Sequence, residues 1–189
     1  MDRQPVLTGE RLALRPLAET DRAALTDIAC DELLWAQHPV PERAEPQFFD
    51  AYFDHLLDKG GALAVIDRAS ATLIGSSSFS NYRAAGRDAV DGAVDGAVEI
   101  GSTFLARSHW GGAANRELKR LMLVHAFGSV ALVEFLIGAD NHRSRAAIAK
   151  IGARLTDRIV DAQFAGRDIP HLVYEITRED FARGPLANP

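Results

Sequence analysis

The first half of the chain alternates short apolar runs with polar breaks. Leucines alternate with arginines from Arg11 to Leu17, which predicts a short strand that Pro16 closes. Acidic residues then open a helix over residues 19–29, because the N-terminus of a helix favours negative charge. Two β-rich runs, 62–67 and 72–80, are separated by the polar segment 68–71 and predict a hairpin.

A second helix is predicted after a break that contains three prolines, at positions 39, 41 and 46. Aromatic residues and leucines recur at helical spacing from Phe48 to Leu57, and Gly60-Gly61 ends the pattern. Such a face usually packs against the core. A lid over a substrate site is the alternative interpretation.

Strands and helices alternate in the second half. The longest helix is predicted over 111–127; it should bury Leu118, Leu121, Met122 and Ala126 and turn Arg116, Glu117, Lys119 and Arg120 toward solvent. The other expected elements are a helix over 143–151 and strands over 98–106, 133–139, 154–163 and 171–177. This order predicts an α/β (α+β mixed) fold, a twisted mixed sheet with helices on both faces.

The length of 189 residues predicts a single domain, 1–189, whose tail at 184–189 is disordered. Between residues 81 and 97, Asp91-Gly92-Ala93-Val94 is repeated at once as Asp95-Gly96-Ala97-Val98. This tandem copy is too short for a repeat fold and indicates a lengthened hairpin loop, to which no chemistry is assigned.

Composition narrows the class of function. The formal net charge of −5 argues against nucleic-acid binding and favours a cationic substrate. Cys30 is the only cysteine, so no intrachain disulfide forms, no multi-cysteine metal site exists, and the cytoplasm is the expected location. No apolar run approaches the length of a membrane helix, and no secretory leader is recognisable, so neither membrane insertion nor secretion is expected.

Two short segments carry candidate chemistry. The first, Ser108 to Asn115, joins a strand to the longest helix and contains Gly111-Gly112. Small residues let a ligand approach the backbone, and the free N–H groups of the first helical turn form an anion site that suits a pyrophosphate. A plain chain reversal would also explain these glycines.

The second segment, Ala139 to Ser144, lies where a buried strand ends and the next helix begins. The side chain of Asn141 has two interpretations there: it caps the helix, or it holds a ligand amide in the cleft beside the strand.

Taken together, these segments resemble the acetyl-CoA-binding core of the GNAT N-acetyltransferases, and the RimJ/RimL-type branch is the best match. Leu7 to Leu17 resembles the opening strand of that branch, and Glu99-Ile100-Gly101 its central strand. Trp110-Gly111-Gly112-Ala113 with Asn115-Arg116-Glu117 resembles its phosphate loop, and Asn141 to Ala153 its second signature. The resemblance covers roughly residues 7–177.

The resemblance implies a sheet whose two central strands splay apart. These are the strand that ends near Ala106 and the strand 133–139. In that family the pantetheine arm of acetyl-CoA enters the splay, so the resemblance implies backbone contacts at Phe104, Leu105 and Ala106. The pyrophosphate would lie on the N–H groups of His109, Trp110, Gly111, Gly112, Ala113, Ala114 and Asn115. Asn141 would bind the pantetheine, with Ser144 near the sulfur.

The implied activity is acetyl transfer from acetyl-CoA to a primary amine, a protein N-terminus or a small molecule, without an acyl-enzyme or a metal. Glu99 is the candidate base and Ser144 the candidate group that assists the leaving thiolate; His109 is a second candidate base. The sequence departs from the family pattern at Ser108 and Ile148, and a glutamate that some relatives carry corresponds to Gln163.

Two further expectations follow from the resemblance. The chain should form a homodimer, to which residues 48–57 and 81–97 contribute. The alternative to an enzyme is a GNAT-fold module that binds or senses acyl-CoA without catalysis.

Overall fold

A computed structural model describes residues 1–84, 96–164 and 167–187. Within these residues eight strands form one sheet in the order β1-β2-β3-β4-β5-β6-β8-β7, and the pair β5 and β6 is parallel while the other neighbours are antiparallel. The strands are β1 (Leu7–Thr8), β2 (Leu12–Pro16), β3 (Ala62–Asp67), β4 (Thr72–Arg83), β5 (Ala97–Leu105), β6 (Leu132–Gly138), β7 (Arg154–Phe164) and β8 (Arg167–Thr177). The α-helices are α1 (Arg22–Ala29), α2 (Glu32–Trp35), α3 (Pro46–Lys59), α4 (Ala113–Phe127), α5 (His142–Lys150) and α6 (Arg178–Arg183).

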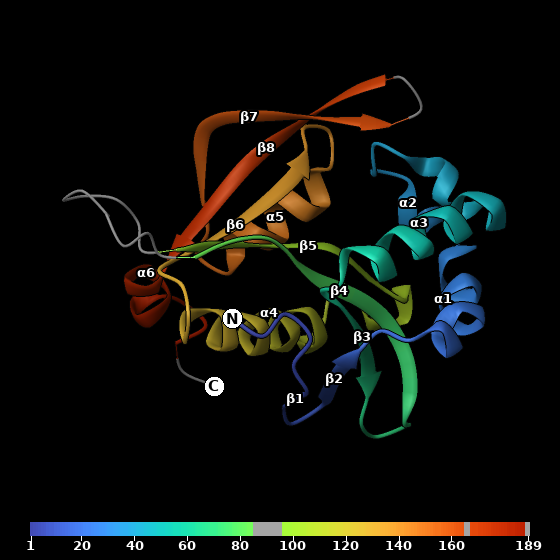
Figure 1. The fold of residues 1–189 in the computed structure, drawn as a ribbon, viewed down its shortest axis with the longest axis horizontal. Coiled ribbons are helices and arrows are strands. Elements are labelled where there is room, and N and C mark those ends of the chain that lie inside the picture. Colours follow the sequence, from blue (N-terminus) through green and yellow to red (C-terminus); the bar gives the residue numbers. More distant parts are fainter. Residues whose placement is uncertain (85–95, 165–166, 188–189) are drawn as a thin grey trace.

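Two apolar cores lie on opposite faces of the sheet, which confirms the predicted mixed α/β fold. Successive side chains of a strand point to opposite faces, and β3 shows the division: Leu63 and Val65 pack with α4, whereas Ala62 and Ala64 pack with α1 and α3. Figure 1 shows α1, α2 and α3 grouped at one side of the molecule, and α4 and α6 close together at another.

The aromatic face of α3 packs inward, as the sequence predicts. Pro46 occupies the first turn, where its missing N–H costs no hydrogen bond, and Gly60 ends the helix with φ of 57°. Phe49 and Phe53 are fully buried in the core shared with α1. The alternative of a separate lid therefore does not apply to this face, although Tyr52 of the same helix also reaches the cavity described below.

The sheet splays apart at its one parallel pair. In the described residues β5 pairs with β6 at three positions, from Ala97 opposite Leu132 to Glu99 opposite Glu134, and then the strands diverge. On its other side β5 remains paired with β4, but the register shifts where Ser102 adopts a φ of 50°. This bulge lies in the splayed part of β5 and changes which side chains point into the gap.

Two expectations about exposure differ from the structure. Lys119 of α4, expected at the surface, is 3% exposed. The segment 184–187, expected to be disordered, packs against the rest of the protein: Leu186 is fully buried, and the carbonyl of Pro185 accepts a hydrogen bond from Arg116. Residues 188–189 and most of the predicted loop 81–97, including the first tandem copy, lie outside the described residues.

Candidate active site

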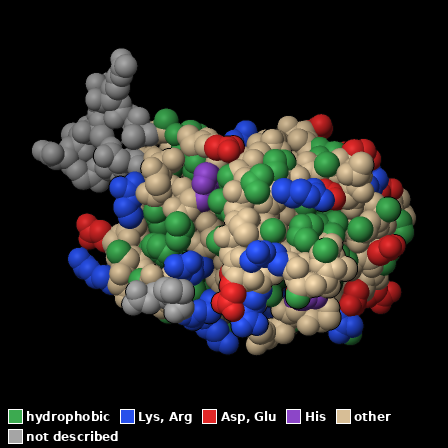
Figure 2. Space-filling view, turned by 90° about the horizontal axis from the view of Figure 1, so that it is seen from below, with side chains coloured by type: hydrophobic (Ala, Val, Ile, Leu, Met, Phe, Trp, Pro, Cys, Tyr) green, Lys and Arg blue, Asp and Glu red, His purple; other side chains and the backbone are tan. Residues whose placement is uncertain are grey.

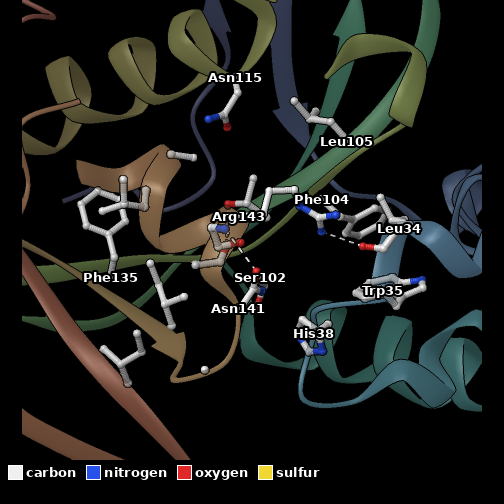
Figure 3. A pocket seen from close by; sticks show the side chains of 18 of the residues that line it. Leu34, Trp35, His38, Ser102, Phe104, Leu105, Asn115, Phe135, Asn141 and Arg143 are labelled. Carbon is white, nitrogen blue, oxygen red and sulfur yellow. Dashed lines mark hydrogen bonds between the residues drawn. The ribbon is translucent and has the colours of Figure 1, made fainter. Parts of the chain in front are cut away.

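A cavity of about 380 Å³ occupies the splay between β5 and β6. Its walls come from the diverging strands, the segment 109–119 that leads into α4, the segment 141–148 that leads into α5, the segment 34–43, Tyr52 of α3 and His171 of β8. Figure 3 shows Asn115 of α4 at one end of this space and His38 at the other, with Ser102, Asn141 and Arg143 between them. None of the described helices is long and apolar enough to cross a membrane.

The end of the cavity at α4 has an open helix N-terminus. Gly112 is the N-cap residue, and an added Cβ at Gly111 or Gly112 would meet no atom within 4 Å. Gly111 also adopts a φ of 70°, which other residues rarely adopt. The indole of Trp110 donates from Nε1 to the carbonyl oxygen of Leu105 at 2.8 Å, which fixes the loop against β5. The first-turn N–H groups are thus accessible to an anion.

Asn141 caps α5, as one of the two interpretations of the sequence predicted. Its Oδ1 accepts the backbone N–H of Ser144 at 3.2 Å, and its side chain is buried in the cavity wall. Because the cap uses the oxygen, the amide nitrogen is the atom of Asn141 that a ligand carbonyl would meet. Ser144 lines the same cavity on the first turn of α5.

Arg143 joins three parts of the wall. Its guanidinium lies 3.9 Å above the ring of Trp110 and donates to the carbonyl of Leu34 at 2.8 Å, and its backbone N–H donates to Oε1 of Gln37. Burial lowers the pKa of Arg143. These contacts hold the segment that begins at Leu34 against the first turn of α5 and against the loop that precedes α4.

Glu99 lies beside the main cavity, in a smaller hollow that also contains Lys59 and Ser80. Ser102 lines both spaces and is the point where they adjoin. Burial raises the pKa of Glu99, and the hydrogen bond that Oε2 accepts from Asn81 at 2.6 Å opposes that shift. A carboxylate whose pKa is moved toward neutrality suits proton transfer.

Lys119 is a cavity residue that the sequence analysis missed. Its Nζ donates to Oγ1 of Thr103 at 2.7 Å and lies 5.7 Å from the centre of the Phe135 ring. Burial lowers the pKa of Lys119 to about 7. The sequence could have indicated its position, because Lys119 follows Asn115 by four residues and residues four apart lie on the same face of a helix.

The structure brings eight of the predicted binding residues to one cavity and leaves the others beside it. The cavity is lined by Phe104, Leu105, His109, Trp110, Gly111, Asn115, Asn141 and Ser144. Glu99, Ala106, Gly112, Ala113 and Ala114 are not in its wall. The N–H of Ala106 donates to the carbonyl of Ile74, and the ring of His109 has Nε2 at 3.6 Å from Oδ2 of Asp67.

The charge of the cavity is opposite to that of the whole chain. Over the described residues its lining contains Arg43, Lys119 and Arg143 but no aspartate or glutamate. Figure 2 shows acidic side chains at several places on one face of the outer surface. The net charge of −5 therefore describes the exterior, and the cavity favours anionic ligand groups.

A mixed sheet that splays at its parallel pair, with an open helix N-terminus at the mouth of the gap, suits a ligand that has an extended arm and phosphate groups. A family model described as an acetyltransferase (GNAT) domain matches residues 11–154. The chain therefore belongs to the GNAT acetyltransferase family, whose members transfer acetyl groups from acetyl-CoA. No curated protein matches the sequence.

Solved structures share the fold at low sequence identity. A GCN5-related N-acetyltransferase from Brucella melitensis has a TM-score of 0.74 at 20% identity, covering 94% of this chain and 80% of that one. RimJ of Mycobacterium smegmatis, in complex with CoA-disulfide, has a TM-score of 0.67 at 18% identity, covering 93% and 86%. Spermidine N-acetyltransferase of Vibrio cholerae, in complex with CoA and spermine, has a TM-score of 0.62 at 16% identity, covering 92% and 99%.

Proposed function

We propose that the protein is a cytoplasmic N-acetyltransferase of the RimJ/RimL type that moves acetyl from acetyl-CoA to a primary amine. The observation that carries the proposal is the cavity in the splay, which runs from the N-terminus of α4 to Ser144 and carries no carboxylate among its described lining residues. Phosphates suit the first-turn N–H groups of α4, and the pantetheine arm suits the gap between the strands.

Transfer is proposed to be direct. The neutral amine attacks the thioester carbonyl carbon, so a C–N bond forms while the C–S bond breaks. Glu99 takes the proton from nitrogen; it acts from the smaller hollow, which shares the lining residue Ser102 with the cavity. The Ser144 hydroxyl donates a hydrogen bond to the departing sulfur. Thiol release from acetyl-CoA, followed over a panel of amines and peptides, tests this function. Binding of acetyl-CoA without thiol release would favour the alternative, a non-catalytic binding module.

The phosphate site makes a prediction for Gly112. Its φ of −105° suits any residue, and an added side chain would enter open space, so Gly112→Leu should fold normally while blocking the approach of phosphate. We expect its dissociation constant for acetyl-CoA, measured by calorimetry, to rise at least about tenfold. Gly112→Ala is the matched control and should lose much less. Equal affinities of the leucine variant and the wild type would show that phosphate does not bind there.

The homodimer is also a proposal, with a different surface from the one expected. The apolar face of α3 packs inside the protein, whereas Leu155, Ile159 and Val160 of the edge strand β7 are 51%, 61% and 41% exposed. Exposed apolar groups on an edge strand favour association. We expect light scattering at micromolar concentration to give a dimer and Ile159→Asp to give a monomer, while Val6→Asp, also at an exposed position, stays dimeric. A monomeric wild type contradicts the proposal.

A further inference from the structure

Arg43 forms the wall of the cavity at the end away from α4. It lies in the turn Pro41–Ala44, and its guanidinium stacks 3.8 Å above the ring of Tyr52 and 5.7 Å from that of Trp35. Pro39 of the same segment lies over Gly138, where an added Cβ would come within 2.8 Å of the proline ring. This places Arg43 near the C-terminal end of β6, whereas the glycines of the proposed phosphate site are at the start of α4.

The guanidinium of Arg43 has one N–H group, at Nε, for which the described residues supply no acceptor. Its Nε is buried and has no hydrogen-bond acceptor, and no described carboxylate pairs with the side chain. The neighbouring Glu42 pairs instead with Arg167, at 2.9 Å. The two other cations of the cavity differ, because Arg143 donates to the carbonyl of Leu34 and Lys119 donates to Thr103. Arg43 is partly buried, and a cation that is partly removed from water without an anion is stabilised when a ligand supplies one.

His38 adds a second donor at the same place. Its Nδ1 accepts the backbone N–H of Val40 at 3.0 Å, and burial, followed by the charge of Arg43, lowers the pKa of His38 to about 3. The ring is therefore neutral and carries its proton on Nε2, which lies 3.1 Å from Nη1 of Arg43. In this tautomer both groups are donors, so an acceptor oxygen beside the pair can accept from both of them.

We infer that the acceptor amine carries a carboxylate, which Arg43 and His38 bind at this end of the cavity. The inference rests on the proposed function, because it assigns the group that approaches the thioester from the side opposite the phosphates. A carboxylate has two oxygens, which can accept from the planar guanidinium and from Nε2–H of His38 together. The rings of Trp35, Tyr52 and Phe104 beside this point suit an apolar side chain, as in a hydrophobic amino acid.

A polyamine is the acceptor that this arrangement disfavours. Polyamines bring several positive charges, which require carboxylates in the wall of a site. The described wall instead contains two arginines and Lys119, and no carboxylate. The net charge of the chain favoured a cationic substrate, but the local charge of the cavity favours an acceptor with an anionic group.

The test compares two acceptors that differ in one group. Thiol release from acetyl-CoA is measured at one pH with L-phenylalanine and with L-phenylalaninamide, and with L-leucine and L-leucinamide, and kcat/KM is expressed per concentration of neutral amine. We expect kcat/KM to be at least about tenfold higher for the acids, because charge-assisted hydrogen bonds discriminate strongly. Arg43→Gln should lower kcat/KM for the acids about 10- to 100-fold and leave the amides unchanged. Arg183→Gln, at an exposed position on α6, should change neither.

A binding measurement separates recognition from folding. 3-Phenylpropionate has the carboxylate and the ring but no amine, so it should raise the Tm of the wild type and not that of Arg43→Gln. Equal kcat/KM for acids and amides, or the same Tm response in both proteins, contradicts the inference while leaving acetyl transfer intact. No thiol release with any amine contradicts the proposed function and the inference with it.

Discussion

Replacing Glu99 by glutamine is expected to lower kcat by about 10²-fold or more while the affinity for acetyl-CoA stays unchanged. General bases contribute about 10²- to 10⁴-fold to such reactions, and an amide cannot take a proton. The exchange is nearly isosteric, and the amide oxygen of the variant can still accept the hydrogen bond from Asn81. The fold around the small hollow should therefore be retained.

The pH dependence gives a second measurement of the same role. A base must be ionised to act, and burial raises the pKa of Glu99 above its ordinary value of 4.5. Wild-type kcat/KM, expressed per concentration of neutral amine, should therefore fall as the pH drops through the raised pKa, and Glu99→Gln should lack that acidic limb. Glu175→Gln, on the partly exposed side of β8, serves as the control and should keep both the rate and the limb. A loss below about fivefold in Glu99→Gln would mean that water or another group removes the proton.

Replacing Lys119 by methionine is expected to stabilise the folded protein at neutral pH. Burial lowers the pKa of Lys119 from 10.5 to about 7, so between these values the unfolded chain binds a proton that the folded chain does not. Stability of the wild type must then rise with pH across this window, by up to about 1.4 kcal/mol per pH unit, and the amine costs roughly 4 kcal/mol near pH 7. Methionine has a similar volume and no charge, so it removes this cost.

Urea unfolding at pH 7, 8, 9 and 10 measures the effect of Lys119. The free energy of unfolding of the methionine variant should exceed that of the wild type at pH 7, and the difference should shrink steadily toward pH 10. Thr103 keeps a partner in the variant, because its Oγ1 lies 2.7 Å from Oγ of Ser77. Lys150→Met, at an exposed lysine, should show no such trend. A difference that does not vary with pH would show that Lys119 is charged in the folded protein.

Local patterns were sufficient for most of the fold. Helical spacing from Phe48 to Leu57 placed α3, and the Gly-Gly turn before residue 113 placed the start of α4. The two segments that carry the family motifs were also predicted to meet at the splay, and Asn115 and Ser144 do line one cavity. These successes share a cause, since each feature depends on residues that are neighbours in the sequence.

The features that sequence could not place depend on contacts between distant segments. The wall formed by Leu34 to Arg43 runs from the end of α2 through the irregular residues 36–40 to the turn Pro41–Ala44, and its position is fixed by Arg143 and by Pro39 over Gly138. Leu186 is buried because the chain end packs against the core that α4 shares, which no periodicity in 184–189 reveals. Glu99 and Ser144 were paired by resemblance alone, because no local pattern relates residues so far apart in the sequence.

The three residue pairs that join β5 to β6 also limit how firmly the two parts of the sheet are held together. They connect two half-sheets, β1 to β5 and β6 to β8, and beyond Glu99 the two edges face each other across the cavity. A small rotation about so short a joint would change the width of the gap along its whole length. A ligand that hydrogen-bonds to both edges would connect the two parts of the sheet and restrict their relative motion. The free energy of unfolding should therefore be higher when the cavity is occupied.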